Sequence, residues 1–227
     1  MFGEVCLIYP AFMRSIAQVG VDEFYKLLQH ITIHPPALSQ KLKGVSGYQF
    51  ILGQSSDVEY AKTTREAISF FLHEECLILP DANILALGGA PGENKFQIVT
   101  EEEFGLIQDI IRQQHWLESI TVRKVEGALD KKAQEILDRI AHGKQTVAKL
   151  KKTQGDGLSL SDIVGSLTIA VPGLNMLNIW DLTYYAFYDQ FHRFQQKEAY
   201  DANSRAALAG AKIPKEKLKS WVRPIEK

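Results

Sequence analysis

The sequence predicts an α+β fold that is predominantly helical. Over most of the 227 residues, apolar side chains recur at the three- and four-residue spacing of one helix face. Only the region from 76 to 99 differs, because it carries three short β-prone runs separated by turn residues. Hydrophobic residues make up 45% and charged residues 23% of the chain, which is typical of a globular protein with a core.

Composition divides this fold into three expected parts. Residues 1–125 predict a mixed α/β N-terminal domain with a small antiparallel meander, and residues 158–227 predict a helical C-terminal domain. Between them, residues 126–157 predict a polar helical connector, since Asp130–Lys152 has only a thin apolar stripe. Such a long helix either links two domains through solvent or forms half of a coiled-coil seam.

The N-terminal domain is expected to begin with a short β-prone run and two helices. Glu4–Tyr9 is the β-prone run, Pro10 suits the first position of a helix, and Gly20 ends that helix. Asp22 can cap the next helix. The apolar residues of this second helix share one face and predict the first part of the core: Phe24, Leu27, Leu28 and Ile31.

A short strand and a longer helix are expected next. The apolar segment Tyr48–Leu52 predicts the strand, and Ser56 or Asp57 caps the helix, which runs to Leu72. The residues expected to face inward from this helix are Ala61, Thr64, Ile68, Phe71 and Leu72.

The meander and one more helix complete the domain. The three predicted strands are Cys76–Leu79, Ile84–Leu87 and Phe96–Val99. Thr100 and Glu103 form a capping box, so a helix begins there and runs to about Trp116. Its expected buried residues are Phe104, Ile107, Ile110 and Ile111.

The C-terminal domain is expected to contain a short helix and a long one. Ser159 or Ser161 caps the short helix. The long helix spans about Asp181–Ala209, with Asp181 as a good N-cap, and ends at Gly210, a good C-cap. Pro214 can open a last amphipathic helix.

The start of the long helix is rich in aromatic residues. Asn178–Phe194 holds seven of them in seventeen positions, against 10% over the whole chain. Most share one helix face and belong to the core, but Tyr185 lies off that face, and buried tyrosine hydroxyls need partners. Aromatic residues also anchor interfaces, so a purely structural role and a role in binding a partner protein both remain open. The predicted partner-binding residues are Trp180, Tyr184, Tyr185 and Tyr188.

No motif indicates a catalytic, cofactor-binding or metal site. The formal net charge of −1 gives no basic excess for nucleic acid. Gly88–Lys95 resembles a phosphate loop but lacks the Gly-Lys-Ser/Thr ending, so a hairpin loop is expected. His30 and His34 are four residues apart, but Pro35 ends their helix. We therefore expect no enzyme, although an active site could still be assembled from distant residues.

The sequence predicts a protein that stays in the cytoplasm in which it is made. Its only cysteines, Cys6 and Cys76, fit two buried thiols in a reducing compartment better than a disulfide. The N-terminus lacks the charged and then apolar pattern of a secretory signal. No stretch approaches the roughly 20 apolar residues that cross a bilayer, so no membrane association is expected.

Several segments, spread over nearly the whole chain, form a recognisable set: Ile8–Pro10, Val19–Leu28, Glu66–Leu72, Leu177–Thr183, Phe187–Phe191, Leu208–Ala211 and Trp221. The set resembles proteins encoded in the tail gene clusters of phages and prophages of Gram-positive bacteria. The opening of the long helix, Trp180–Thr183, is also similar to that of tail assembly chaperones.

This resemblance implies a non-enzymatic factor in tail morphogenesis. Tail assembly chaperones hold the long helical tape-measure protein and help to recruit tail-tube subunits, then leave before the particle is complete. The implied partners are therefore tape-measure and tail-tube proteins together with further copies of the chain, in the host cytoplasm. The alternative is a structural component of the virion, such as a tail, neck or baseplate subunit.

Overall fold

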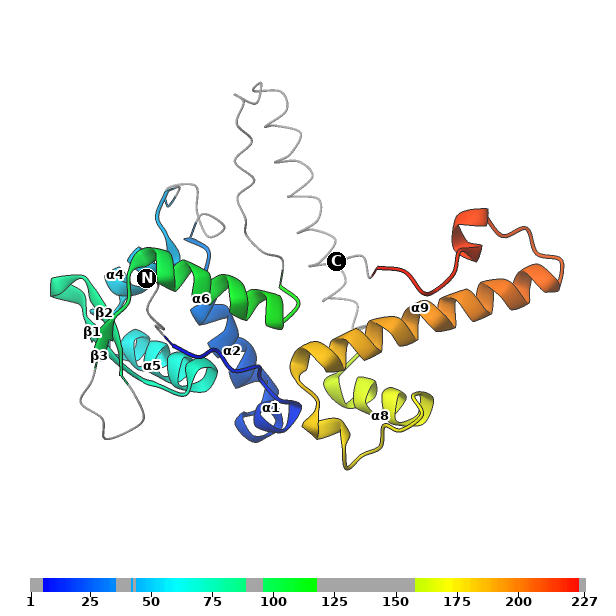
Figure 1. Cartoon of the computed structure of the whole chain (residues 1–227), viewed down its shortest axis with the longest axis horizontal. Coiled ribbons are helices and arrows are strands. Elements are labelled where there is room, and N and C mark those ends of the chain that lie inside the picture. The colour runs from blue at the N-terminus through cyan, green and yellow to red at the C-terminus, as the bar shows by residue number, and fades with distance from the viewer. Residues whose placement is uncertain (1–5, 36–41, 43, 89–95, 118–157, 225–227) are drawn as a thin grey trace, which may run out of the picture. The chain divides into compact units, whose positions relative to one another are not determined.

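The structure is a computed structural model that describes residues 6–35, 42, 44–88, 96–117 and 158–224 (Figure 1). The chain forms two compact units, one of Met1–Ser119 with Leu177–Lys227 and one of Ile120–Met176. The described residues contain seven α-helices and a three-stranded antiparallel sheet, which confirms the predominantly helical α+β fold class. The predicted connector at 126–157 lies outside the described residues. The proposed domains at 1–125 and 158–227 stay a prediction.

The larger unit starts with two helices on either side of a sharp turn. Only Gly20 separates α1 (Met13–Val19) from α2 (Val21–Ile31), and its φ of +95° strains any residue with a Cβ. The apolar face predicted for α2 is buried in full, and α2 packs against α5 (Val58–Leu72). Asp57 caps α5 as predicted, by accepting a hydrogen bond from a backbone N–H of the first turn. The residues predicted to face inward from α5 are all buried: Ala61, Thr64, Ile68, Phe71 and Leu72.

The predicted strand Tyr48–Leu52 is wrong, because this segment lies in helix α4 (Gly47–Gln54). The hydroxyl of Ser46 accepts a hydrogen bond from the backbone N–H of Gln49 and so starts a helix. The buried residues of α4 then follow helical spacing: Gly47, Tyr48, Ile51 and Leu52. A short apolar run is compatible with either a strand or a helix. In this segment, the Ser46 cap favours the helix.

The predicted antiparallel meander is confirmed. Its strands are β1 (Glu75–Leu79), β2 (Ile84–Gly88) and β3 (Phe96–Ile98), in the order β1-β2-β3. A 3₁₀ turn at Pro80–Ala82 and the left-handed Asn83, with φ of +54°, connect β1 to β2. The central strand β2 is buried along most of its length.

Helix α6 (Glu101–Gln114) carries two polar residues within its buried face. Phe104, Ile107 and Ile111 are buried as predicted, but Ile110 is exposed, and that part of the prediction is wrong. Gln108 and Arg112 are buried because their side chains donate to backbone carbonyls at the C-terminal end of α2, at 2.7 and 2.6 Å. They satisfy acceptors that the helix end leaves unpaired.

The capping box predicted at the start of α6 is present, and it carries the first testable expectation. The Thr100 hydroxyl accepts from the backbone N–H of Glu103 at 3.3 Å, and the Glu103 carboxylate accepts from the Thr100 N–H at 2.8 Å. Thr100→Ala should lower the free energy of unfolding by about 1 kcal/mol in urea denaturation. Thr63→Ala, which removes a hydroxyl from the middle of α5, should change it by less than about 0.5 kcal/mol. Equal losses in both variants would contradict the capping role.

The aromatic helix α9 (Tyr184–Leu208) begins three residues later than predicted. Its N-cap is Thr183, whose hydroxyl accepts from the Ala186 N–H at 3.2 Å. The predicted cap, Asp181, lies in the 3₁₀ turn η3 (Ile179–Asp181). The carboxylate of Asp181 instead forms an ion pair with Arg14 at 2.6 Å.

The chain leaves α9 through a glycine turn. Gly210 has a φ of +90° just beyond the last helical turn, as predicted for the helix end. The amphipathic helix predicted after Pro214 is limited to the 3₁₀ turn η4 (Lys215–Leu218).

The described part of the smaller unit contains helix α8 (Leu160–Ala170). Ser159 caps this helix as predicted, and Asp162 completes a capping box with it. Ile163, Val164 and Leu167 are buried, whereas Ile169 is exposed.

Candidate partner-binding site

The start of α9 is fixed against the segment that enters α1. The backbone N–H of Met13 donates to the Leu182 carbonyl at 2.9 Å, and that of Tyr184 donates to the Ala11 carbonyl at 2.7 Å. These bonds belong to an antiparallel bridge between the two segments. The bridge brings the first turns of α9 to the rings of α2 and of the C-terminal end of α6.

A buried aromatic cluster forms where these elements meet. Phe24 on α2 is fully buried at its centre, with four ring centroids between 5.5 and 6.2 Å from its own. These neighbours are Phe70, Phe71, His115 and Tyr184. The cluster therefore joins α2, α5, the end of α6 and α9 into one core.

His115 is a buried titratable group within this cluster. Its Nδ1 lies 2.6 Å from the Ile111 carbonyl and donates to it, because a carbonyl can only accept. Among the described residues, Nε2 has no hydrogen-bond partner. Burial lowers the pKa of His115 to about 4, so the ring is neutral at pH 7.

Three tyrosine hydroxyls share a half-buried site beside the cluster. The Tyr25 hydroxyl lies 3.4 Å from that of Tyr184 and 3.3 Å from that of Tyr188. Burial raises the pKa of Tyr184 and of Tyr188, so both hydroxyls remain protonated at neutral pH. The three groups supply the partners that buried tyrosines need.

Next to these hydroxyls, four aromatic side chains form a partly exposed patch, which we call the ring surface: Trp116, Tyr185, Tyr188 and His192. Trp116 has a φ of +56° and stacks on Tyr185 with ring centroids 5.0 Å apart at 17°. Its Nε1 donates to the Tyr185 carbonyl at 3.1 Å. The patch is therefore preorganised, with flat rings held in place by contacts between α9 and the turn that follows α6.

The four residues predicted to bind a partner lie in different environments. Tyr185 is 44% exposed, whereas Tyr184 is 8% exposed and has little surface to offer. Tyr188 is half-buried and contributes to the ring surface. Trp180 is half-buried in η3, where it lines a shallow pocket of about 240 Å³. Their role in binding stays a prediction.

Sequence reasoning missed two members of the ring surface. His192 follows Tyr188 by four residues, a spacing that places both on one side of a helix. That spacing could have identified His192 as a neighbour of Tyr188 from the sequence. Trp116 is 69 residues away from Tyr185, and no local pattern connects the two.

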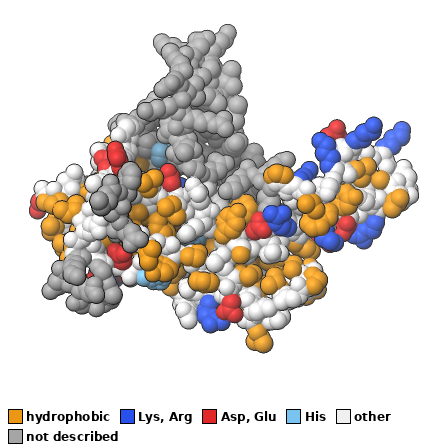
Figure 2. Space-filling model, viewed as in Figure 1, with side chains coloured by type: hydrophobic (Ala, Val, Ile, Leu, Met, Phe, Trp, Pro, Cys, Tyr) orange, Lys and Arg blue, Asp and Glu red, His pale blue; other side chains and the backbone are white. Residues whose placement is uncertain are grey.

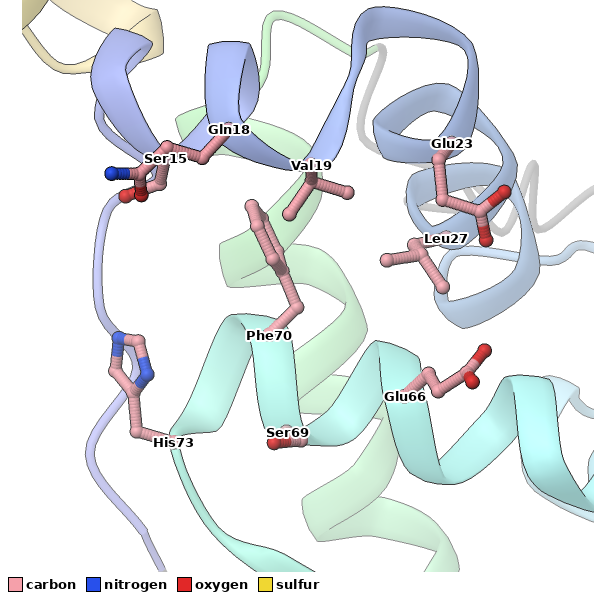
Figure 3. A pocket seen from close by; sticks show the side chains of 9 residues that line it. All are labelled: Ser15, Gln18, Val19, Glu23, Leu27, Glu66, Ser69, Phe70 and His73. Atoms are coloured by element: carbon pink, nitrogen blue, oxygen red, sulfur yellow. The ribbon is translucent and has the colours of Figure 1, made fainter.

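An open groove of about 570 Å³ lies between α1, α2 and α5 (Figure 3). Val19, Leu27 and Phe70 give it an apolar base, and Phe70 rises from α5 toward Val19. Glu23 and Glu66 also line it. The Glu23 carboxylate lies 3.0 Å from Nζ of Lys26, and the Glu66 carboxylate lies 3.9 Å from Nζ of Lys62, each within its own helix. The groove can accept an apolar side chain between these two paired carboxylates.

The C-terminal half of α9 is less buried than its first half. Its first half contains the buried residues Tyr184, Phe187 and Phe191, but none of the residues from Gln195 to Leu208 is buried. Lys and Arg side chains gather at this end of the helix and on the segment after it, at the right of Figure 2. The positive charge is thus concentrated locally in a chain whose net charge is −1.

Histidine and cysteine side chains are common metal ligands, and three of them have defined contacts or burial. His30 Nε2 lies 2.8 Å from the Thr64 hydroxyl, which itself donates to a backbone carbonyl, so Nε2 donates to Thr64. Burial and the nearby charge of Lys26 lower the pKa of His30 to about 4. Cys6 and Cys76 are free thiols whose pKa burial raises to about 11 and about 12. The described residues contain no group of three or more His, Cys, Asp or Glu placed to hold a metal ion.

None of the helices in the described ranges combines the length and the apolar composition needed to cross a membrane.

Comparison with known proteins gives a match over part of the chain. Residues 149–226, about a third of the chain, match the family model of the second domain of YomV. The matched range contains both α8 and α9. No curated protein and no solved structure matches the sequence. YomV is a protein of phage and prophage regions of Gram-positive bacteria, and the match supports a phage-associated protein.

Proposed function

We propose that the protein is a non-enzymatic phage tail morphogenesis factor that acts as a tail assembly chaperone in the host cytoplasm. In this role it binds the tape-measure protein and helps to recruit tail-tube subunits. The observation that carries the proposal is the ring surface, three of whose four residues lie on α9 inside the range that matches the second domain of YomV.

The chemistry of the ring surface suits a helical client. Aromatic side chains with polar tips offer large contact area at small loss of conformational freedom, and they are frequent anchors in interfaces. The stack of Trp116 on Tyr185 holds two of these rings in place before the client arrives. An amphipathic helix could lay its apolar face on this patch and continue along α9, whose 25 residues span roughly 37 Å.

The first test removes the most exposed ring of the ring surface. Tyr185→Ala should reduce the amount of co-expressed tape-measure protein that co-purifies with the chain by at least about tenfold. The reason is that aromatic residues in interfaces often contribute about 2 kcal/mol or more to binding. Stability should fall by only about 1 kcal/mol, the value of one lost ring stack. The matched control is Tyr9→Ala, since Tyr9 is 43% exposed and Tyr185 is 44% exposed. Unchanged client binding in Tyr185→Ala, or equal weakening in Tyr9→Ala, would refute the proposed site.

A second measurement separates the chaperone from the alternative, a structural virion component. Mass spectrometry should find the protein abundant in infected-cell lysate and absent from purified particles. A fixed copy number in the particle would instead make it a tail, neck or baseplate subunit, and the ring surface a permanent interface.

A further inference from the structure

Positive charge is concentrated at one end of the chain. Residues 205–224, which we call the basic arm, comprise the last turn of α9 and the segment after it. They contain one carboxylate, Glu216, and six basic residues: Arg205, Lys212, Lys215, Lys217, Lys219 and Arg223. The basic arm therefore has a local net charge of +5. Because the whole chain has a net charge of −1, all other residues together have a net charge of −6.

The basic residues of the arm are open to solvent and to a ligand. All six are exposed, and they contribute to the positive patch at the right of Figure 2. Within the described ranges, none of the six forms an ion pair. Asp201 lies one turn before Arg205 on α9, but its carboxylate is paired with Lys197 at 2.7 Å. A ligand with dense negative charge would therefore meet six cations that no described carboxylate neutralises.

The basic arm is attached to the helix that precedes it. Gly210 allows the chain to turn, and η4 then packs against α9 (Figure 1). Three apolar residues of the arm are half-buried: Ile213, Leu218 and Trp221. The basic residues between them are exposed, so the apolar side chains hold the segment while the charges point into solvent.

Trp221 adds an aromatic ring to this positive surface. It stands two residues after Lys219 and two residues before Arg223. Trp116 stacks on Tyr185, whereas Trp221 lies against no other ring of the described residues. Part of its indole remains exposed. A flat ring among cations is the combination with which proteins bind single-stranded nucleic acid, because the cations follow the phosphates and the ring stacks on a base.

Two other classes of polyanion fit the basic arm less well. A segment that lies in an anionic membrane surface needs a helix with a continuous apolar face. Here η4 has only four residues, and Val222 is the only large apolar residue between Gly210 and Pro224 that is exposed. Carboxylates of an acidic protein are best held by the two-pronged guanidinium of arginine, but four of the six basic residues are lysines.

We propose that the basic arm binds single-stranded nucleic acid, with its lysines along the phosphate backbone and Trp221 as the platform for a base. The net charge of −1 argued against nucleic acid only as an average over the whole chain. Salt screens charges beyond about 8 Å at physiological ionic strength, so a phosphate on the arm responds mainly to the local charge. A single strand is required because a base must be unpaired to stack on Trp221.

The experiment is fluorescence anisotropy of labelled oligothymidylate and oligouridylate of about 20 nucleotides, titrated with the full chain between about 50 and 200 mM salt. Each phosphate contact with a single strand contributes about −0.7 to the slope of log K against log salt concentration. Four to six contacts should therefore give a slope of about −3 to −4.

Charge removal tests the phosphate contacts. The triple variant Lys215→Gln, Lys217→Gln, Lys219→Gln should bind at least about tenfold more weakly, with a slope less steep by about 2. The matched control, Lys26→Gln, Lys62→Gln, Arg65→Gln, removes the same charge from exposed positions on α2 and α5 and should bind like the wild type.

Removal of the ring tests the base contact. Trp221→Ala should weaken binding about fivefold or more without changing the slope, because it removes no charge. Trp221→Phe keeps a ring and should retain most of the affinity. Thermal unfolding checks that each variant is folded.

Four results would overturn the proposal: no binding at about 50 mM salt, an equal loss in the control triple variant, no loss in Trp221→Ala, or equal affinity for polyglutamate of the same length. The last result would assign the basic arm to an acidic protein. The outcome is independent of client binding, because Tyr185→Ala leaves the basic arm intact and should bind the oligonucleotides like the wild type.

Discussion

Phe24→Ala should lower the free energy of unfolding by about 3 to 5 kcal/mol, the largest loss that we expect from a single substitution in this protein. Phe24 is fully buried, and the rings around it come from α5, the end of α6 and α9. Removing its ring leaves a cavity that four separate segments line, so the site cannot close by a small movement of one helix. The free energy of unfolding of a whole domain is only about 5 to 15 kcal/mol, so this loss is a large share of the total stability.

Urea denaturation measures this effect, with Phe12→Ala as the matched control. Phe12 is exposed and lies at the start of α1, so its truncation should change stability by less than about 1 kcal/mol. A loss below about 1 kcal/mol for Phe24→Ala would show that the cluster does not hold the four segments together.

Much of this core could be predicted because its signals are local. Asp57 caps α5 and Thr100 caps α6 through groups only three residues away, and the helical spacing of Phe24 and Ile31 marks the buried face of α2. Such signals need no knowledge of the partners that a helix will find.

The errors arise where distant residues decide between two locally acceptable structures. Asp181 is as good a cap as Thr183, but it lies in the turn η3 with its carboxylate on Arg14, far away in the sequence, and Thr183 caps α9. Ile110 has the helical spacing of a core residue, yet Gln108 and Arg112 take buried places because they bind the end of α2. Neither long-range contact leaves a mark in the local sequence.

The candidate site, like the core, could be predicted only where its signals are local. The position of Tyr185 off the buried face of α9 follows from helical spacing. Burial of Tyr184 beside Phe24, and the stacking of Trp116 on Tyr185, depend on how α9 docks against α2 and the end of α6. That docking rests on backbone hydrogen bonds between the entry to α1 and the start of α9, which side-chain patterns do not encode.

Acidification should destabilise the protein between about pH 6.5 and pH 4 through His115, in addition to the usual effect of its carboxylates. Burial lowers the pKa of His115 in the folded chain to about 4 from an ordinary value of 6.5. In this window the unfolded chain binds a proton that the folded chain does not, so stability is complete above pH 6.5 and falls as the pH falls. The loss is at most about 1.4 kcal/mol per pH unit, on the order of 3 kcal/mol by pH 4.

His115→Asn isolates this contribution, because an asparagine amide can occupy the place of Nδ1 and still donate to the Ile111 carbonyl. The variant should be less stable than the wild type at pH 7, since it loses a buried ring, but its stability should fall less steeply between about pH 6.5 and pH 4. Burial also lowers the pKa of His30 to about 4, so His30→Asn should remove a second share of the slope and the double variant should remove both. Urea denaturation at a series of pH values gives the slopes. An unchanged slope in His115→Asn would mean that the buried ring takes up its proton in the folded state as readily as in the unfolded state, and that the cluster around Phe24 tolerates a positive charge.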